Sequence, residues 1–272
     1  PKASRTARGR AMVNVLNLSS DEIVTACVPV RDLDTEGHFV FMVTRRGVVK
    51  KTALKAFSNP RTTGIRAIEL DGDDALVAVH VTSGNDNILI ATHDGMAIRF
   101  PEGDVRAMGR QARGVIGIRL RPEDFVIGVS VARDEATVLS VTEHGYGKRT
   151  QVAEYRMQAR SGQGTINVKV TPKTGKVVGM LTVDDRDEVV LVATDGIVIR
   201  CAVKDIRTIG RNTQGVRVMK PQAGARVSGL ALALADEKEA AVTEEAVLDD
   251  EDAGGGEDAG AGEDAPANGE EE

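Results

Sequence analysis

The chain has 272 residues, 41% of them hydrophobic, and a formal net charge of −6, which is enough apolar material to fill a folded core. It contains neither an apolar run of the roughly 18 residues that span a membrane nor the apolar segment of a signal peptide, so we expect a cytoplasmic protein with no membrane partner. Its cysteines, Cys27 and Cys201, and its four histidines are not spaced as metal ligands, so no metal site is expected.

Two markers repeat along the chain with a period near 50 residues. The first is an Arg-x-x-x-Gly box, with a Pro60–Gly64 variant in one repeat; it begins at Arg5, Arg110, Arg160 and Arg211. The second is a turn glycine that precedes basic residues, at Gly47, Gly95, Gly145 and Gly196. We therefore predict a repeat domain over residues 1–235, with repeats near 1–57, 58–107, 108–155, 156–206 and 207–235, the first and last partial. The sequence starts with Pro1 inside a repeat, so we expect a fragment of a longer chain.

The local pattern within each repeat is that of strands. An alternating segment such as 165–170 follows the box, and a polar turn leads to a β-branched run, at 76–81, 125–131 or 177–183. Two further runs flank the turn glycine as a hairpin; the pairs are 39–43 with 48–51, 88–91 with 96–100, 137–141 with 146–150, and 189–193 with 197–201. Four strands in about 50 residues are typical of a propeller blade, so we predict an all-β fold of about five four-stranded blades.

The last 37 residues differ in composition from the rest. Residues 236–272 hold 16 Asp and Glu against one Lys, a balance of −15, which leaves +9 for residues 1–235. Gly, Ala, Asp and Glu without periodicity predict a disordered acidic tail over 236–272. The basic body is typical of a protein that binds a polyanion.

Basic residues gather at the same corners of successive repeats, Arg106, Arg156 and Arg207 among them. In a radial arrangement such positions form one positive belt, which favours a phosphate backbone. Aromatic residues are few and do not alternate with the basic ones, so duplex DNA is favoured over single strands or RNA. The predicted DNA contacts are Arg5, Arg8, Arg10, Arg45, Arg46, Lys50, Lys51, Arg61, Arg66, Arg99, Arg110, Arg113, Lys148, Arg149, Arg160, Lys169, Arg200, Arg211 and Arg217. The box glycines are interpreted as structural.

The box from Gln158 to Gly164 resembles a degenerate copy of the Gln-Arg-Arg-Gly-Gly-Lys-Gly box in the C-terminal domain of the DNA gyrase A subunit. The matching positions are Gln158, Arg160, Gly162 and Gly164, whereas Ser161 and Gln163 depart from the pattern. The segments 4–9, 92–95 and 210–217 are also similar to that family, and the resemblance spans residues 1 to about 235.

The resemblance implies a β-pinwheel, a spiral variant of the propeller, that wraps duplex DNA and supports ATP-dependent negative supercoiling by a bacterial type IIA topoisomerase. The partners implied are duplex DNA, the remainder of the gyrase A polypeptide and the gyrase B polypeptide. ATP and Mg²⁺ would be used by other parts of the enzyme, so we expect neither cofactor nor catalytic residue in this chain. The family's principal box would lie before Pro1.

Two alternatives remain open from the sequence. One is the C-terminal domain of the paralogous topoisomerase IV subunit, against which the box at Gln158–Gly164 argues modestly. The other is a non-enzymatic propeller that binds protein partners and uses its charge only for solubility.

Overall fold

The computed structural model describes residues 18, 22–61 and 64–233, which form strands and short 3-10 turns and, within these ranges, no α-helix. The all-β prediction is confirmed. The described residues belong to one compact unit. No helix in the described ranges is long and apolar enough to cross a membrane. The predicted acidic tail lies outside the described residues.

The strands recur in the order of the repeats. They are β1 (Phe39–Thr44), β2 (Val48–Ala53), β3 (Leu76–Thr82), β4 (Asn87–Thr92), β5 (Met96–Pro101), β6 (Val115–Ile116), β7 (Val126–Ala132), β8 (Thr137–Thr142), β9 (Tyr146–Gln151), β10 (Thr165–Ile166), β11 (Val177–Val183), β12 (Glu188–Ala193), β13 (Val198–Ala202), β14 (Val216–Arg217) and β15 (Val227–Ala233). A 3-10 turn follows the second hairpin strand of each repeat, at Leu54–Phe57, Glu102–Asp104, Val152–Glu154 and Val203–Asp205.

These strands form four antiparallel sheets, not about five. Their orders are β3-β1-β2-β6 (blade 1), β10-β5-β4-β7 (blade 2), β11-β8-β9-β14 (blade 3) and β13-β12-β15 (blade 4). Each of the four predicted hairpins is present, and each lies in a different blade. The estimate of five came from counting the boxes, and a box does not begin a blade of its own.

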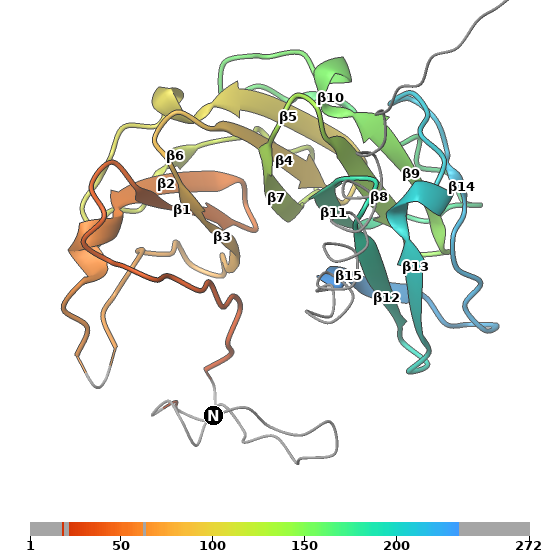
Figure 1. The fold of residues 1–272 in the computed structure, drawn as a ribbon, viewed down its shortest axis with the longest axis horizontal. Coiled ribbons are helices and arrows are strands. Elements are labelled where there is room, and N and C mark those ends of the chain that lie inside the picture. The colour runs from red at the N-terminus through yellow and green to blue at the C-terminus, as the bar shows by residue number, and fades with distance from the viewer. Residues whose placement is uncertain (1–17, 19–21, 62–63, 234–272) are drawn as a thin grey trace, which may run out of the picture. The chain divides into compact units, whose positions relative to one another are not determined.

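Each four-stranded sheet takes its outer strand from a later box. The strand β6 follows the box at Arg110 but pairs with β2 of blade 1, and β10 and β14 pair in the same way with β5 and β9. The alternating strand predicted over 165–170 is therefore only Thr165–Ile166 long, because Asn167 and Val168 donate instead to the carbonyl of Gly95. Figure 1 shows β6, β10 and β14 on the outer side of the sheets and β3, β7, β11 and β15 on the inner side.

The hydrophobic core lies between consecutive sheets, and in the first three blades both faces of the first hairpin strand are covered, whereas Val192 in β12 of blade 4 is exposed. In β4, Ile88 and Ile90 pack against Phe41 of blade 1, whereas Leu89 and Ala91 belong to the cluster that includes Val138 of blade 3. A third cluster joins blades 3 and 4. This two-sided burial explains why the first hairpin strands read as continuous apolar runs.

The hairpin glycines adopt a positive φ, which only glycine adopts without strain. In the first three blades they also lie against the backbone that follows a later box, so a Cβ at Gly145 would clash with the carbonyl oxygen of Met219. Gly196 of blade 4 has a similar φ of +82°, but nothing described lies within 4 Å of its Cβ position.

Alanine substitutions at Gly145 and Gly196 measure the cost of backbone strain separately from the cost of steric contact. Gly196→Ala is expected to lower the free energy of unfolding by about 1–2 kcal/mol through the positive φ alone. Gly145→Ala should lose about 1–3 kcal/mol more, because the outer segment must also move. Chemical denaturation of both variants measures the difference, and equal losses would contradict the close packing of the outer segment.

Candidate nucleic-acid interface

The box loops and the segments that follow them lie along the outer edge of the blades and are joined from one repeat to the next. The amide of Glu69 donates to the carbonyl of Ala112 over 3.3 Å, that of Arg119 to Gly162 over 2.8 Å, and that of Lys169 to Thr213 over 3.0 Å. We call this continuous surface the rim; it comprises residues 59–61, 64–69, 106–120, 156–170 and 207–220.

Two sets of exposed cations occupy equivalent positions on the rim. One set, Arg106, Arg156 and Arg207, directly precedes the boxes, and the other, Arg119, Lys169 and Lys220, follows them. Within the described chain, none of these six side chains forms an ion pair or a hydrogen bond. Arg106, Arg156 and Arg207 were predicted to lie on the positive belt, and Lys169 was among the predicted contacts. Arg119 and Lys220 were missed, although each lies 50 or 51 residues from Lys169.

The box arginines have a partly structural role. Arg160 donates to the carbonyls of Asp104 and Ile116, and Arg211 donates to that of Ile166, each over 3.0 Å. Both side chains thereby attach one repeat to the outer strand of the repeat before it, while they stay half-exposed on the rim.

The other predicted contacts on the rim differ in whether their side chains already have a partner within the described chain. Arg61, Arg66 and Arg110 make no side-chain ion pair with any described residue. Arg113 pairs with Glu69 and Asp71, and Arg217 donates to the Tyr146 hydroxyl over 2.8 Å.

The last glycine of each described box, Gly64, Gly114, Gly164 or Gly215, has a positive φ, which is a structural requirement for glycine. Gly164 has a φ of +77°, and a Cβ there would clash with the carbonyl of Ala97 in β5. The backbone amide of Gln158 donates to the carbonyl of Arg99 and so aligns the box with the same strand. Ser161, which stands where the resembled box has glycine, keeps a φ of +70°, a conformation that costs a non-glycine residue on the order of 1–2 kcal/mol.

Five predicted contacts are corrected by the structure, because their side chains are buried. They are Lys50, Lys51, Arg99, Lys148 and Arg149, with exposed fractions between 0% and 7%. In the first three blades the second hairpin strand is covered on both faces, so the basic residues after the turn glycine point into the protein, where they contact carbonyls and carboxylates instead of solvent.

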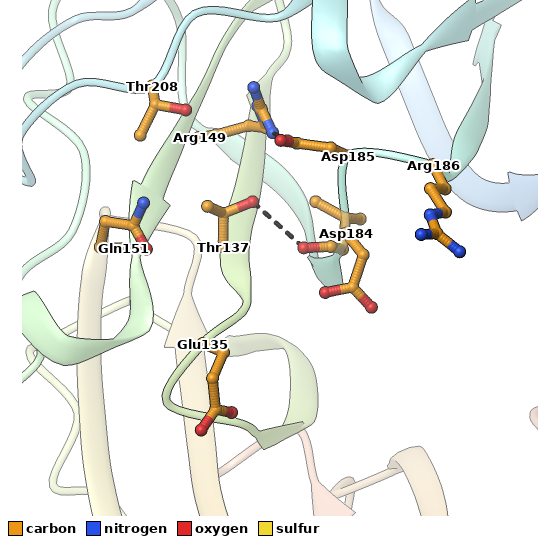
Figure 2. A pocket seen from close by; sticks show the side chains of 9 residues that line it. Glu135, Thr137, Arg149, Gln151, Asp184, Asp185, Arg186 and Thr208 are labelled. Atoms are coloured by element: carbon orange, nitrogen blue, oxygen red, sulfur yellow. Dashed lines mark hydrogen bonds and ion pairs between the residues drawn. The ribbon is translucent and has the colours of Figure 1, made fainter. Parts of the chain in front are cut away.

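Three of these buried cations connect each blade to the next. Lys51 lies 3.7 Å from Glu102, while Arg99 pairs with Asp134 and donates to the carbonyl of Val152. The third is Arg149, which pairs with Asp185 and donates to the carbonyl of Ile206 over 2.7 Å. Arg149 and Asp185 line a polar cleft of about 530 Å³. Figure 2 shows their side chains meeting there. This cleft holds charges of both signs, so it does not extend the positive surface.

The remaining predicted contacts lie elsewhere. Arg45 stacks on Phe125 with 3.6 Å between its guanidinium carbon and the ring centre, and Arg46 pairs with Asp73 near the hairpin turn. Arg200 pairs with Glu188 within blade 4. Arg5, Arg8 and Arg10 lie outside the described residues. In the described ranges, no three His, Cys, Asp or Glu side chains gather as metal ligands.

Lys148 holds a box loop in place from beneath. Its ammonium donates to the carbonyls of Gly210 and Arg211 and to the Thr150 hydroxyl. Burial lowers the pKa of Lys148 from 10.5 to about 8, an effect that Glu154 opposes and Arg211 reinforces. Lys50 makes one equivalent bond in blade 1, to the carbonyl of Arg110, and a second bond to that of Ala67.

This lowered pKa predicts a pH-dependent stability. Between about pH 8 and pH 10.5 the folded protein binds fewer protons at Lys148 than the unfolded chain does, so this side chain adds stability as the pH rises. Lys148→Met lacks this contribution. The free energy of unfolding of wild type should therefore increase relative to that of the variant as the pH rises through that window. Urea denaturation across the window measures it, and parallel pH profiles would show that the lysine is not perturbed.

The chain is similar to known proteins over most of its length. A family described as "DNA gyrase C-terminal domain, beta-propeller" matches residues 38–83, 86–133, 136–184 and 187–233. The DNA gyrase A protein of Salmonella typhimurium is 42% identical over 230 residues, which are 85% of this chain and 26% of that protein. The DNA gyrase A protein of Clostridium acetobutylicum is 45% identical over 239 residues, 88% of this chain and 29% of that protein. The chain thus spans between a quarter and a third of these relatives.

Solved structures share the fold. The C-terminal domain of DNA topoisomerase IV has a TM-score of 0.79 at 27% identity, over 88% of this chain and 75% of that one. The DNA gyrase A C-terminal domain has a TM-score of 0.76 at 22% identity, over 84% and 76%. Because the family match covers each of the four blades and the relatives in sequence are gyrase A proteins, the chain belongs to the family of DNA gyrase C-terminal domains with a propeller-like β-pinwheel fold.

Proposed function

We propose that the rim binds duplex DNA through its backbone and bends it around the blades, as the DNA-wrapping part of a gyrase A protein in ATP-dependent negative supercoiling. The observation that carries this proposal is the presence of two sets of exposed cations, which pair with no described residue, at equivalent positions of three successive repeats. Because the rim is continuous through hydrogen bonds between repeats, these charges lie along one path, as contacts to consecutive stretches of a phosphate backbone require.

The aromatic residues favour a duplex over a single strand. All seven phenylalanines and tyrosines are buried or half-buried, and Tyr155, Phe41 and Phe100 have exposed fractions of 1% or less. Single-stranded nucleic acids are bound by exposed rings on which bases stack. Phosphate contacts to a duplex need no such ring.

The rest of the proposal concerns the whole enzyme. ATP and Mg²⁺ act in its other parts, this region supplies no catalytic residue, and its partners are the remainder of gyrase A and the gyrase B protein in the cytoplasm. The gyrase assignment is favoured over topoisomerase IV by the identities of 42% and 45% to gyrase A proteins.

Salt dependence and linking number test the proposal. Duplex affinity should fall steeply with salt, with a log–log slope of about −0.9 for each phosphate contacted. When a nicked circle is ligated with the protein bound, wrapping should leave a positive shift in linking number. A flat salt slope would instead indicate a propeller that binds proteins, and a steep slope without a linking shift would contradict wrapping.

A further inference from the structure

One cleft on the rim carries positive charge without a neighbouring acid. It has a volume of about 360 Å³ and lies between the variant box of the first blade and the following box. Arg61, Arg66 and Arg110 line it, and no Asp or Glu is among the described residues that line it. The other lining residues are Asn59, Gly64, Ile65 and Gln111.

A buried lysine lies beneath this cleft and adds a fourth positive charge. Lys50 is fully buried, and its ammonium donates to the carbonyl of Ala67 over 2.6 Å and to that of Arg110. Burial lowers the pKa of Lys50, and the charge of Arg110 lowers it further. Like charges repel one another at such a site, and a bound anion would relieve that repulsion.

The other blades hold an acid at the equivalent place. The third residue of the 3-10 turn is Asp104, Glu154 and Asp205 in blades 2, 3 and 4, but it is Ala56 in blade 1. In blade 3, Glu154 accepts the amide of Arg211 over 3.3 Å, next to the carbonyls that Lys148 binds. Because Lys50 binds Arg110 as Lys148 binds Arg211, Ala56 leaves the first cleft without the carboxylate found in the third blade.

We propose that this cleft is a phosphate-binding site and that it makes the tightest single backbone contact to duplex DNA among the described repeats. This proposal rests on the proposed function and names the position on the rim at which a backbone phosphate is bound most tightly. A backbone phosphate fits the chemistry because arginines bind phosphate oxygens with paired N–H groups and need no base contact.

The test is to restore the missing acid. Ala56 is exposed, so Ala56→Asp should fold normally, and its carboxylate should pair with the cleft arginines. Duplex affinity at about 0.1 M salt is expected to fall about eightfold, and the log–log salt slope to decrease by about 0.9, as for one lost phosphate contact. The matched control is Asn85→Asp, with the same charge change in the exposed turn between β3 and β4, where affinity should change less than about twofold.

The reciprocal variant and a small probe complete the design. Glu154→Ala removes the acid of blade 3 and should tighten duplex binding. Equal losses of duplex affinity in Ala56→Asp and Asn85→Asp would overturn the proposal. It would also be overturned if wild type binds inorganic phosphate at the cleft and Ala56→Asp does not, while the two proteins bind duplex DNA equally well. If wild type itself shows no salt-dependent duplex binding, the proposed function fails instead.

Discussion

Replacing Arg106, Arg156 and Arg207 together with alanine is expected to weaken duplex binding about 500-fold at 0.1 M salt. Each phosphate contact contributes about 0.9 to the log–log salt slope, so at this salt each lost contact lowers affinity about eightfold. The three side chains are exposed and pair with no described residue, so their removal leaves no buried group unsatisfied and should not change the free energy of unfolding. Fluorescence anisotropy at several salt concentrations measures both affinity and slope.

A second triple variant is the control. Arg133, Arg186 and Arg226 are also exposed, but they lie in turns next to the inner strands. Their replacement by alanine changes the net charge by the same amount and should leave the slope unchanged. If the two triple variants lose affinity equally, binding depends on net charge and not on the rim.

Glu102→Val is expected to destabilise the protein by about 3–5 kcal/mol, because it removes one partner of a buried charge pair. The Glu102 carboxylate has no exposed surface; it accepts the Thr82 hydroxyl over 2.7 Å and the amides of Gly84 and Asp86, and lies 3.7 Å from the Lys51 ammonium. Thermal and chemical denaturation measure the loss.

Combining this change with Lys51→Met gives a decisive comparison. The equivalent residues of the other blades are apolar, Leu54, Val152 and Val203, so the position can hold a valine, and the double variant leaves no buried ammonium without a partner. The Thr82 hydroxyl and the amides of Gly84 and Asp86 lose their acceptor in both variants. The double variant should therefore be more stable than Glu102→Val alone. Losses that simply add would show that the two side chains do not interact.

The repeat, the hairpins and the turn glycines could be predicted from sequence because each leaves a local pattern: a fixed period, apolar runs and a residue that permits a positive φ. The outer strands could not be predicted in this way. Val115–Ile116 is two residues long, too short for a periodic signal, and nothing local indicates that it pairs with Val48 and Val49 more than 60 residues earlier in the chain.

The same limit explains the errors in the predicted interface. Lys50 and Arg106 are both basic residues that recur near repeat landmarks, and only the tertiary structure places one in the interior and the other on the rim. Burial of Lys50 depends on carbonyls of Ala67 and Arg110, which are remote in sequence. For Arg119 and Lys220, by contrast, the spacing would have been sufficient to predict the contact, because each lies one repeat away from Lys169 in the sequence.

Because each described outer strand belongs to the segment that forms the next blade, the 50-residue unit of the sequence differs from the unit that folds as a sheet. A tandem duplication of 50 residues would insert one more such segment. Its outer strand would pair with the sheet before it, and its own sheet would receive an outer strand from the segment after it. The number of blades can then change by one without leaving a new unpaired edge strand between them. Deletion of a single outer segment has the opposite effect, since it damages the sheet of a neighbour whose own sequence is intact.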